Sequence, residues 1–205
     1  MDFVKFFIKR LLSFAVIYKM PDKSVYLTFD DGPHPVVTER ILDILQQEQI
    51  KATFFIVGDN VNQYQNIIKR IAKEGHSIGY HTKNHKTLNE ISIRTLQEEI
   101  SYMKNGLLSK IAKKNIMLFR PPHGKISVIG LLLFYFNRIK IIQWSIDSRD
   151  SHSSDISAIL DTFKQKKING GEIILFHDDE EHTPELVKRV IEVLRNNTFK
   201  AINVG

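Results

Sequence analysis

The feature that most limits what this chain can fold into is a regular alternation of short β-rich runs with helical patterns. VYLTF at residues 25–29 and ATFFIV at residues 52–57 read as strands, and each is followed by a segment whose apolar residues lie three or four apart. Alternating β and α units predict a parallel sheet with right-handed crossover connections. The other strands are expected at residues 76–80, 116–120, 139–144, 172–176 and 201–204, and the helices at residues 37–45, 61–71, 93–111, 126–136, 155–167 and 185–194.

Short polar clusters directly follow five of these strands. In chain order they are TFDDGP, HTKNH, RPPHG, DSRD and LFHD. A barrel brings the carboxyl ends of its strands together on one face, whereas an open sheet would scatter them. A chain of 205 residues is long enough for one such domain. We therefore expect an α/β fold in which residues 25–205 form a small (β/α) barrel of about seven parallel strands.

The first 20 residues are the most apolar stretch of the chain. Their apolar residues recur at helical spacing, at Phe3, Phe7, Leu11, Phe14 and Tyr18. Basic residues interrupt them, and the longest uncharged run is far shorter than the roughly 20 residues that span a bilayer. No small-x-small cleavage site follows. The pattern favours an amphipathic helix within residues 1–24 that packs on the domain, with a peripheral membrane anchor through residues 1–20 or a signal peptide as alternatives.

Composition limits the chemistry that is available. The chain has no cysteine, which excludes disulfides, thiolate metal sites and cysteine nucleophiles, so a metal must be bound by His, Asp or Glu. The net charge of +6 is interpreted as lysines dispersed over the surface, because no run of five basic residues and no nucleic-acid motif is present. No nucleic-acid partner is expected.

Two of the polar clusters together suggest a metal site. Asp30 and Asp31 are adjacent in one cluster, and His81 and His85 are four residues apart in another. On a helical turn this spacing places both imidazoles on one side, as two ligands of one metal require. Two nitrogens and one carboxylate leave coordination positions open for water and substrate. One aspartate would bind the metal and the other would pair with Arg120 and act as a base.

The last two clusters supply an acid. His177 ends the strand at residues 172–176, and Asp147 and Asp150 follow the strand before it. Beside a metal and a base, His177 is the natural general acid, with an aspartate that holds its tautomer and raises its pKa.

The five clusters, in this order and spacing, resemble the motifs of the polysaccharide deacetylase family, also called the NodB homology domain or carbohydrate esterase family 4. The resemblance covers residues 25–204. It implies a distorted (β/α) barrel and a hydrolase that removes acetyl groups from sugars such as N-acetylglucosamine polymers. It also implies a divalent metal, zinc first, with cobalt, nickel or manganese as alternatives.

The resemblance assigns roles around that metal. It implies that Asp31, His81 and His85 bind the metal, and that Asp30 is the catalytic base. Arg120 would hold Asp30 in position.

The resemblance also assigns the acid and the substrate contacts. His177 would be the general acid and Asp150 would orient it. Leu175 would line the pocket for the acetyl methyl group, and Pro122 and His123 would contact the substrate.

Two positions depart from the family pattern. Ser151 stands where relatives often have Trp, and His123 where they often have Tyr. Losing the Trp would widen the pocket, unless another segment covers it; a lineage difference without consequence is the alternative.

Other functions stay open. They are a metal-dependent hydrolase of a non-sugar amide and a non-catalytic carbohydrate-binding protein; an iron oxygenase is weaker, because it explains neither Arg120 nor His177. An acetylated glycan is the expected partner and a monomer the expected state. The resemblance suggests the cell envelope, but no convincing cleavable signal peptide is present, so a cytoplasmic or membrane-peripheral location stays open.

Overall fold

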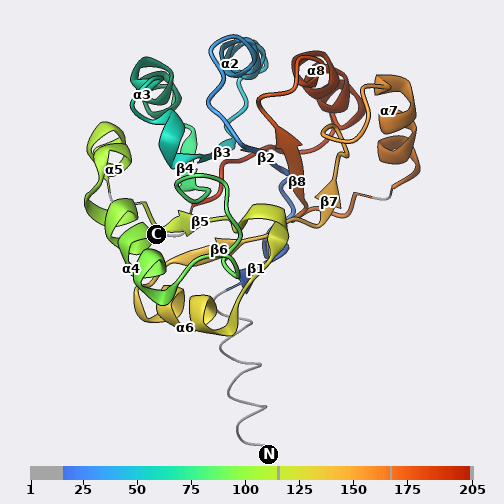
Figure 1. The fold of residues 1–205 in the computed structure, drawn as a ribbon. Coiled ribbons are helices and arrows are strands. Elements are labelled where there is room, and N and C mark those ends of the chain that lie inside the picture. Colours follow the sequence, from blue (N-terminus) through green and yellow to red (C-terminus); the bar gives the residue numbers. More distant parts are fainter. Residues whose placement is uncertain (1–15, 115, 167, 204–205) are drawn as a thin grey trace, which may run out of the picture.

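A computed structural model describes residues 16–114, 116–166 and 168–203 (Figure 1). These residues form one sheet whose neighbouring strands are all parallel, in the order β1-β6-β5-β4-β3-β2-β8-β7. The strands are β1 (Val16–Ile17), β2 (Tyr26–Asp30), β3 (Thr53–Ile56), β4 (Ser77–Tyr80), β5 (Leu118–Phe119), β6 (Lys140–Ile142), β7 (Ile146–Asp147) and β8 (Ile173–His177). The sheet curls, with β1 and β7 at its edges, so the expected distorted barrel is confirmed.

Helices surround the outside of the curled sheet (Figure 1). They are α2 (Val37–Gln47), α3 (Gln65–Lys73), α4 (Ile93–Asn105), α5 (Leu107–Ala112), α6 (Val128–Phe136), α7 (Ile156–Gln165) and α8 (Thr183–Val193), with short 3-10 turns at η1 (Gly58–Asn60) and η2 (Pro122–Gly124). None of the described helices is long and apolar enough to cross a membrane.

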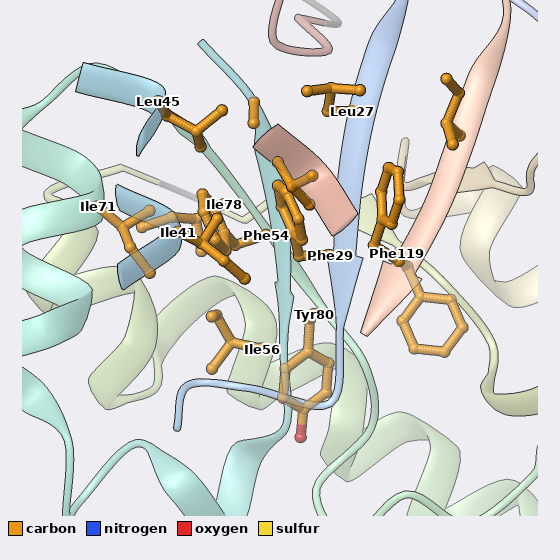
Figure 2. Packing of buried hydrophobic residues seen from close by; sticks show 14 of the residues in the cluster. Leu27, Phe29, Ile41, Leu45, Phe54, Ile56, Ile71, Ile78, Tyr80 and Phe119 are labelled. Carbon is orange, nitrogen blue, oxygen red and sulfur yellow. The ribbon is translucent and has the colours of Figure 1, made fainter. Parts of the chain in front are cut away.

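Strand residues alternate between two buried faces. Leu27 and Phe29 point outward into the large core under the helices, where Phe29 stacks on Phe54 with ring centroids 4.9 Å apart (Figure 2). Tyr26 belongs to a second, smaller core, and Asp30 lies at the same alternation inside the curl. Because side chains alternate along a strand, each strand that buries apolar residues outward also brings a residue to the interior, where the polar clusters meet.

Several expectations about the strands and helices need correction. The described end of the expected N-terminal helix contains strand β1, which pairs with β6, so the sheet begins before residue 25; residues 1–15 of that helix lie outside the described residues. Strand β7 was not expected. The strand expected at residues 201–204 is wrong for residues 201–203, where the chain makes single contacts such as the bond from Ile202 N–H to Thr53 Oγ1.

The helix expected over residues 93–111 is two helices. The backbone is extended at Gly106, where a Cβ would lie 2.4 Å from the Tyr102 carbonyl oxygen. The apolar period continues through the break because α4 and α5 both pack on the same core.

Candidate active site

A buried ion pair lies in the interior of the curled sheet. Arg120 follows β5, is 0% exposed, and donates to Asp30 Oδ1 over 2.8 Å and to Thr28 Oγ1 over 2.8 Å. Its other nitrogens donate to the carbonyls of Ile142 and Gln143, and its guanidinium lies 4.2 Å from the ring centre of Phe55. Burial raises the pKa of Asp30, and the charge of Arg120 opposes that rise. The structure thus places a carboxylate that is a stronger base than an exposed one.

The neighbouring carboxylate faces two imidazoles. Asp31 Oδ1 lies 3.4 Å from His81 Nε2 and 3.1 Å from His85 Nε2. His81 Nδ1 lies 2.7 Å from the Arg120 carbonyl oxygen, which can only accept, so Nδ1 carries the proton and Nε2 presents a lone pair. Burial lowers the pKa of His81 to about 3, which keeps this ring neutral.

This arrangement fits a metal ion. Asp31 Oδ1 is buried and accepts no hydrogen bond from the described residues. One ligand atom from each of Asp31, His81 and His85 lies within 4.8 Å of the others. A buried carboxylate oxygen without a donor, facing two imidazole nitrogens, would be stabilised by a cation between them. These are the three residues predicted as ligands.

Hydrogen bonds to Asp178 stabilise the turn that carries Asp31. Asp178 is buried and its Oδ1 accepts from Gly32 N–H at 2.9 Å, while its Oδ2 accepts from the Thr38 hydroxyl at 2.6 Å. Any Cβ at Gly32 would lie 2.1 Å from Asp178 Oδ2, so glycine is required there. Burial raises the pKa of Asp178 to about 8. Asp178 therefore fixes the backbone next to Asp31.

The loop that carries His81 and His85 rests on a residue that sequence reasoning missed. Glu99, on α4, is buried, and accepts from Lys83 N–H at 3.1 Å and from the Tyr80 hydroxyl. Burial raises its pKa. A signal was present in the sequence, because Glu99 adjoins the apolar stripe of its helix at Ile100.

His177 and Asp150 form the second polar pair. His177 Nδ1 lies 2.7 Å from Asp150 Oδ1. Asp150 also accepts from the backbone N–H groups of His177 and Ser151 and from the hydroxyls of Ser148 and Thr183. Burial lowers the pKa of His177, but the hydrogen bond and charge of Asp150 outweigh it and raise that pKa to about 9.

Asp147, the alternative partner, instead accepts from Arg149 N–H at 2.7 Å. Asp150 is therefore the aspartate that contacts His177.

The expected substrate contacts are placed differently from one another. Leu175 is two residues before His177 on β8 and therefore shares its face, inside the curl. His123 is exposed, has a left-handed backbone with φ 55°, and its ring centre lies 5.0 Å from that of His85. Pro122 is buried, so its side chain offers little surface to a substrate. Ser151 is exposed, and no large side chain stands at that position.

Together these groups can carry out hydrolysis. They comprise a buried base, a cluster able to hold a cation, and an imidazole whose raised pKa keeps it protonated at neutral pH. Such a set of groups is suited to hydrolysis, so the site indicates that the class of protein is a hydrolase.

Comparison with known proteins agrees with this class. Residues 18–131 match the family model described as polysaccharide deacetylase. A peptidoglycan-N-acetylglucosamine deacetylase of Bacillus cereus is 31% identical over 197 residues, which cover 93% of this chain and 91% of that protein. A chitooligosaccharide deacetylase of Sinorhizobium fredii is 32% identical over 155 residues, 76% of this chain and 72% of that protein. This chain belongs to the polysaccharide deacetylase family and is a hydrolase of carbon–nitrogen bonds other than peptide bonds.

Another Bacillus cereus protein with the peptidoglycan deacetylase name is 40% identical over 127 residues. The match covers 62% of this chain but only 46% of that protein, so the chain spans less than half of its length.

Solved structures confirm the fold. A peptidoglycan N-acetylglucosamine deacetylase in complex with 4-naphthalen-1-yl-N-oxidanyl-benzamide superposes with a TM-score of 0.86 at 30% identity, covering 93% of this chain and 92% of that one. A family 4 pseudoenzyme from Bacillus anthracis also shares the fold, with a TM-score of 0.84 at 24% identity over 93% of this chain and 68% of that one.

Proposed function

We propose that this protein is a metal-dependent deacetylase that hydrolyses the acetamide of N-acetylated amino sugars in a poly- or oligosaccharide. The observation that carries this proposal is the buried Asp31 Oδ1, which lacks a donor among the described residues and faces two imidazole nitrogens. A divalent cation at Asp31, His81 and His85, zinc first, supplies charge that polarises the acetamide carbonyl and acidifies water.

Asp30 removes the proton of the attacking water. Its Oδ1 is bound by Arg120, while its Oδ2 lies 3.7 Å from His81 Nε2 and so faces the metal cluster. The ion pair with Arg120 fixes the carboxylate, and burial makes it more basic. Arg120 is a positioning residue, because its donors are all directed at the protein.

His177 protonates the departing amine. An amine is a poor leaving group unless it receives a proton, and Asp150 keeps His177 protonated at neutral pH. The Asp150 bond also fixes Nδ1 as the inner nitrogen, so Nε2 presents its proton to the substrate.

The substrate class rests on the relatives. Proteins named for peptidoglycan N-acetylglucosamine and for chitooligosaccharide match most of this chain, and both names share an N-acetylated glucosamine unit. Leu175 would pack on the acetyl methyl group, and His123 would lie beside the sugar. Ser151 is exposed and small, so the site would be more open at this position, which would allow a polymer chain to pass across it.

Acetate release tests the proposal. The substrates are N-acetylglucosamine oligomers and peptidoglycan fragments. Cyclic amides are tested separately as non-sugar substrates, and each assay is run with zinc and with a chelator. We expect zinc-dependent release from the sugars only, and none with Asp30→Asn. Turnover of the cyclic amides alone would indicate a different carbon–nitrogen hydrolase, and glycan binding without turnover would indicate a non-catalytic relative.

A further inference from the structure

Helix α6 presents an apolar face to solvent. Its sequence is VIGLLLFYF, with no charged residue, and it buries Leu131 and Phe134 against the core. Val128 is 74% exposed and Phe136 is 76% exposed, and Ile129 and Leu132 between them are also exposed. These four residues, the α6 stripe, follow one another along one side of the helix over about 12 Å. Helices at a protein surface normally carry polar residues on their outer face, so the stripe calls for an apolar partner.

The positive charge of the chain is concentrated on the same side. Residues 100–146 contain eight Lys and Arg and no Asp or Glu, which leaves 21 basic against 23 acidic residues in the rest of the chain. This stretch includes the last six of the 13 residues of α4, all of α5 and all of α6, which lie together in Figure 1. Arg120, one of these eight residues, is buried in its ion pair with Asp30, and the other seven give this part of the chain its positive charge.

A pocket rich in lysine adjoins the stripe. It lies at α4 and α5 and is lined by Lys104, Asn105, Ser109, Lys110, Lys113 and Lys114. Lys104 Nζ donates to Asn137 Oδ1 over 2.7 Å, and Asn137 directly follows Phe136 at the end of α6. A cationic surface and an apolar surface therefore meet at Phe136.

Charge decides which partner fits. Residues 1–15 carry Lys5, Lys9 and Arg10 against Asp2, so their net charge has the same sign as that of the lysine pocket. A second copy of this face would bring the same lysines. A water-soluble polyanion would neutralise the lysines and leave the stripe in water.

We propose that the α6 stripe and the lysine pocket dock on an anionic lipid surface. The apolar side chains of the stripe enter the acyl boundary while the lysines meet the lipid phosphates, the two contributions that together give stable peripheral binding.

Sedimentation of the full chain with vesicles tests the proposal. The vesicles contain equal parts phosphatidylglycerol and phosphatidylcholine, or phosphatidylcholine alone. We expect binding to the anionic vesicles only, weakened by salt, with a loss of about tenfold or more in the double variant Ile129→Ser/Phe136→Ser. Lys113→Gln/Lys114→Gln should weaken binding by about fivefold per lysine. Val193→Ser, at an exposed valine of α8 away from this face, should bind as the unchanged chain does.

Several results would overturn the proposal. One is equal binding to both vesicle types, or none to either; another is unchanged binding in Ile129→Ser/Phe136→Ser. Loss of binding in Phe3→Ser/Phe7→Ser combined with full binding in the α6 variant would assign the contact to the first residues alone. Light scattering that shows a dimer, lost in the α6 variant, would assign the stripe to a second copy. Melting curves establish that each variant is folded, and these surface substitutions should leave them unchanged.

Discussion

The proposed acid side of the site, His177 and Asp150, and the proposed metal side, Asp31, His81 and His85, differ in how many hydrogen bonds their carboxylates accept. Asp150, on the acid side, accepts five hydrogen bonds, from Ser148, Ser151, Thr183 and twice from His177. Asp31, on the metal side, has a buried Oδ1 that accepts none from the described residues. One carboxylate is satisfied by the protein itself, and the other is placed where only an added cation would satisfy it.

This difference indicates that one side is fully organised by folding, whereas the other depends on a bound metal. The acid side is organised by folding alone, since its donors belong to the backbone and to short side chains nearby. On the metal side, Asp31 Oδ1 lacks a hydrogen-bond donor among the described residues, and a bound metal would supply the missing positive charge. Asp30 and Arg120 contact the metal side directly, because the Arg120 carbonyl oxygen lies 2.7 Å from His81 Nδ1.

Metal removal should show the largest effect. Treatment with a chelator should reduce deacetylation to background, and zinc should restore it, because the cluster would lose its cation. The melting temperature should fall as well, since the metal binds only the folded chain. The Nδ1–H proton NMR signal of His177 checks the comparison. We expect it to persist in the metal-free protein, and its disappearance would mean that the two sides are not independent.

Asp30→Asn should have the next largest effect. We expect kcat to fall by about 10² to 10⁴ because the base is lost, and stability to fall by about 3 kcal/mol because Arg120 loses its buried partner. Zinc affinity, measured by competition with a chromophoric chelator, should change little. Asp31→Asn is the matched variant and should show the reverse, a large loss of zinc affinity. If Asp30→Asn lost zinc as Asp31→Asn does, the roles of the two adjacent carboxylates would be misassigned.

Much of the fold could be predicted because buried elements leave recognisable apolar patterns in the sequence. Strands β2, β3, β4 and β8 are largely buried on both faces, so they read as short apolar runs and were expected within one or two residues of their bounds. The edge strands β1 and β7 have two residues each, too few to show any period. The break at Gly106 left the period intact, so only the backbone reveals it.

The candidate site could be predicted where residue type and strand position both carried information. Asp31, His81 and His85 come together as expected, because each follows a strand end on one face. The choice between Asp147 and Asp150 needed the path of the loop after β7. The position of Glu99 beside an apolar stripe indicated burial, but its partners Tyr80 and Lys83 could not be predicted, because they lie 19 and 16 residues away along the chain.

Asp150→Asn should reduce kcat by about 10², with zinc affinity unchanged, which separates the acid side from the metal side. Asp150 raises the pKa of His177, so the variant should lose its acid at a lower pH than the unchanged enzyme. The alkaline limb of the kcat profile should therefore move to lower pH. Asp147→Asn is the control and should leave the limb in place.

The free energy of unfolding of the metal-free protein should also depend on pH through His177. A raised pKa means that the charged His177 stabilises the fold below pH 6.5 and that this contribution is lost as pH rises through about 9. The contribution is about 3 kcal/mol by the size of the shift. Urea unfolding between pH 6 and 10 should show this decline in the unchanged protein and a much smaller one in Asp150→Asn. Equal declines in both would mean that Asp150 does not set this pKa.

Glu99→Ala should have the smallest effect, and it tests whether the metal side is supported from outside the cluster. Removing the carboxylate leaves Lys83 N–H and the Tyr80 hydroxyl without their acceptor and frees the loop between His81 and His85. Zinc affinity should fall by about 10- to 100-fold, as for other residues that orient metal ligands. Glu99→Gln keeps one acceptor oxygen and should recover part of that loss, while the acid side keeps its pH limb. Glu98→Ala, an exposed neighbour paired with Arg94, is the control. If Glu99→Ala lowered the melting temperature with no change in zinc affinity, Glu99 would support α4 and not the ligand loop.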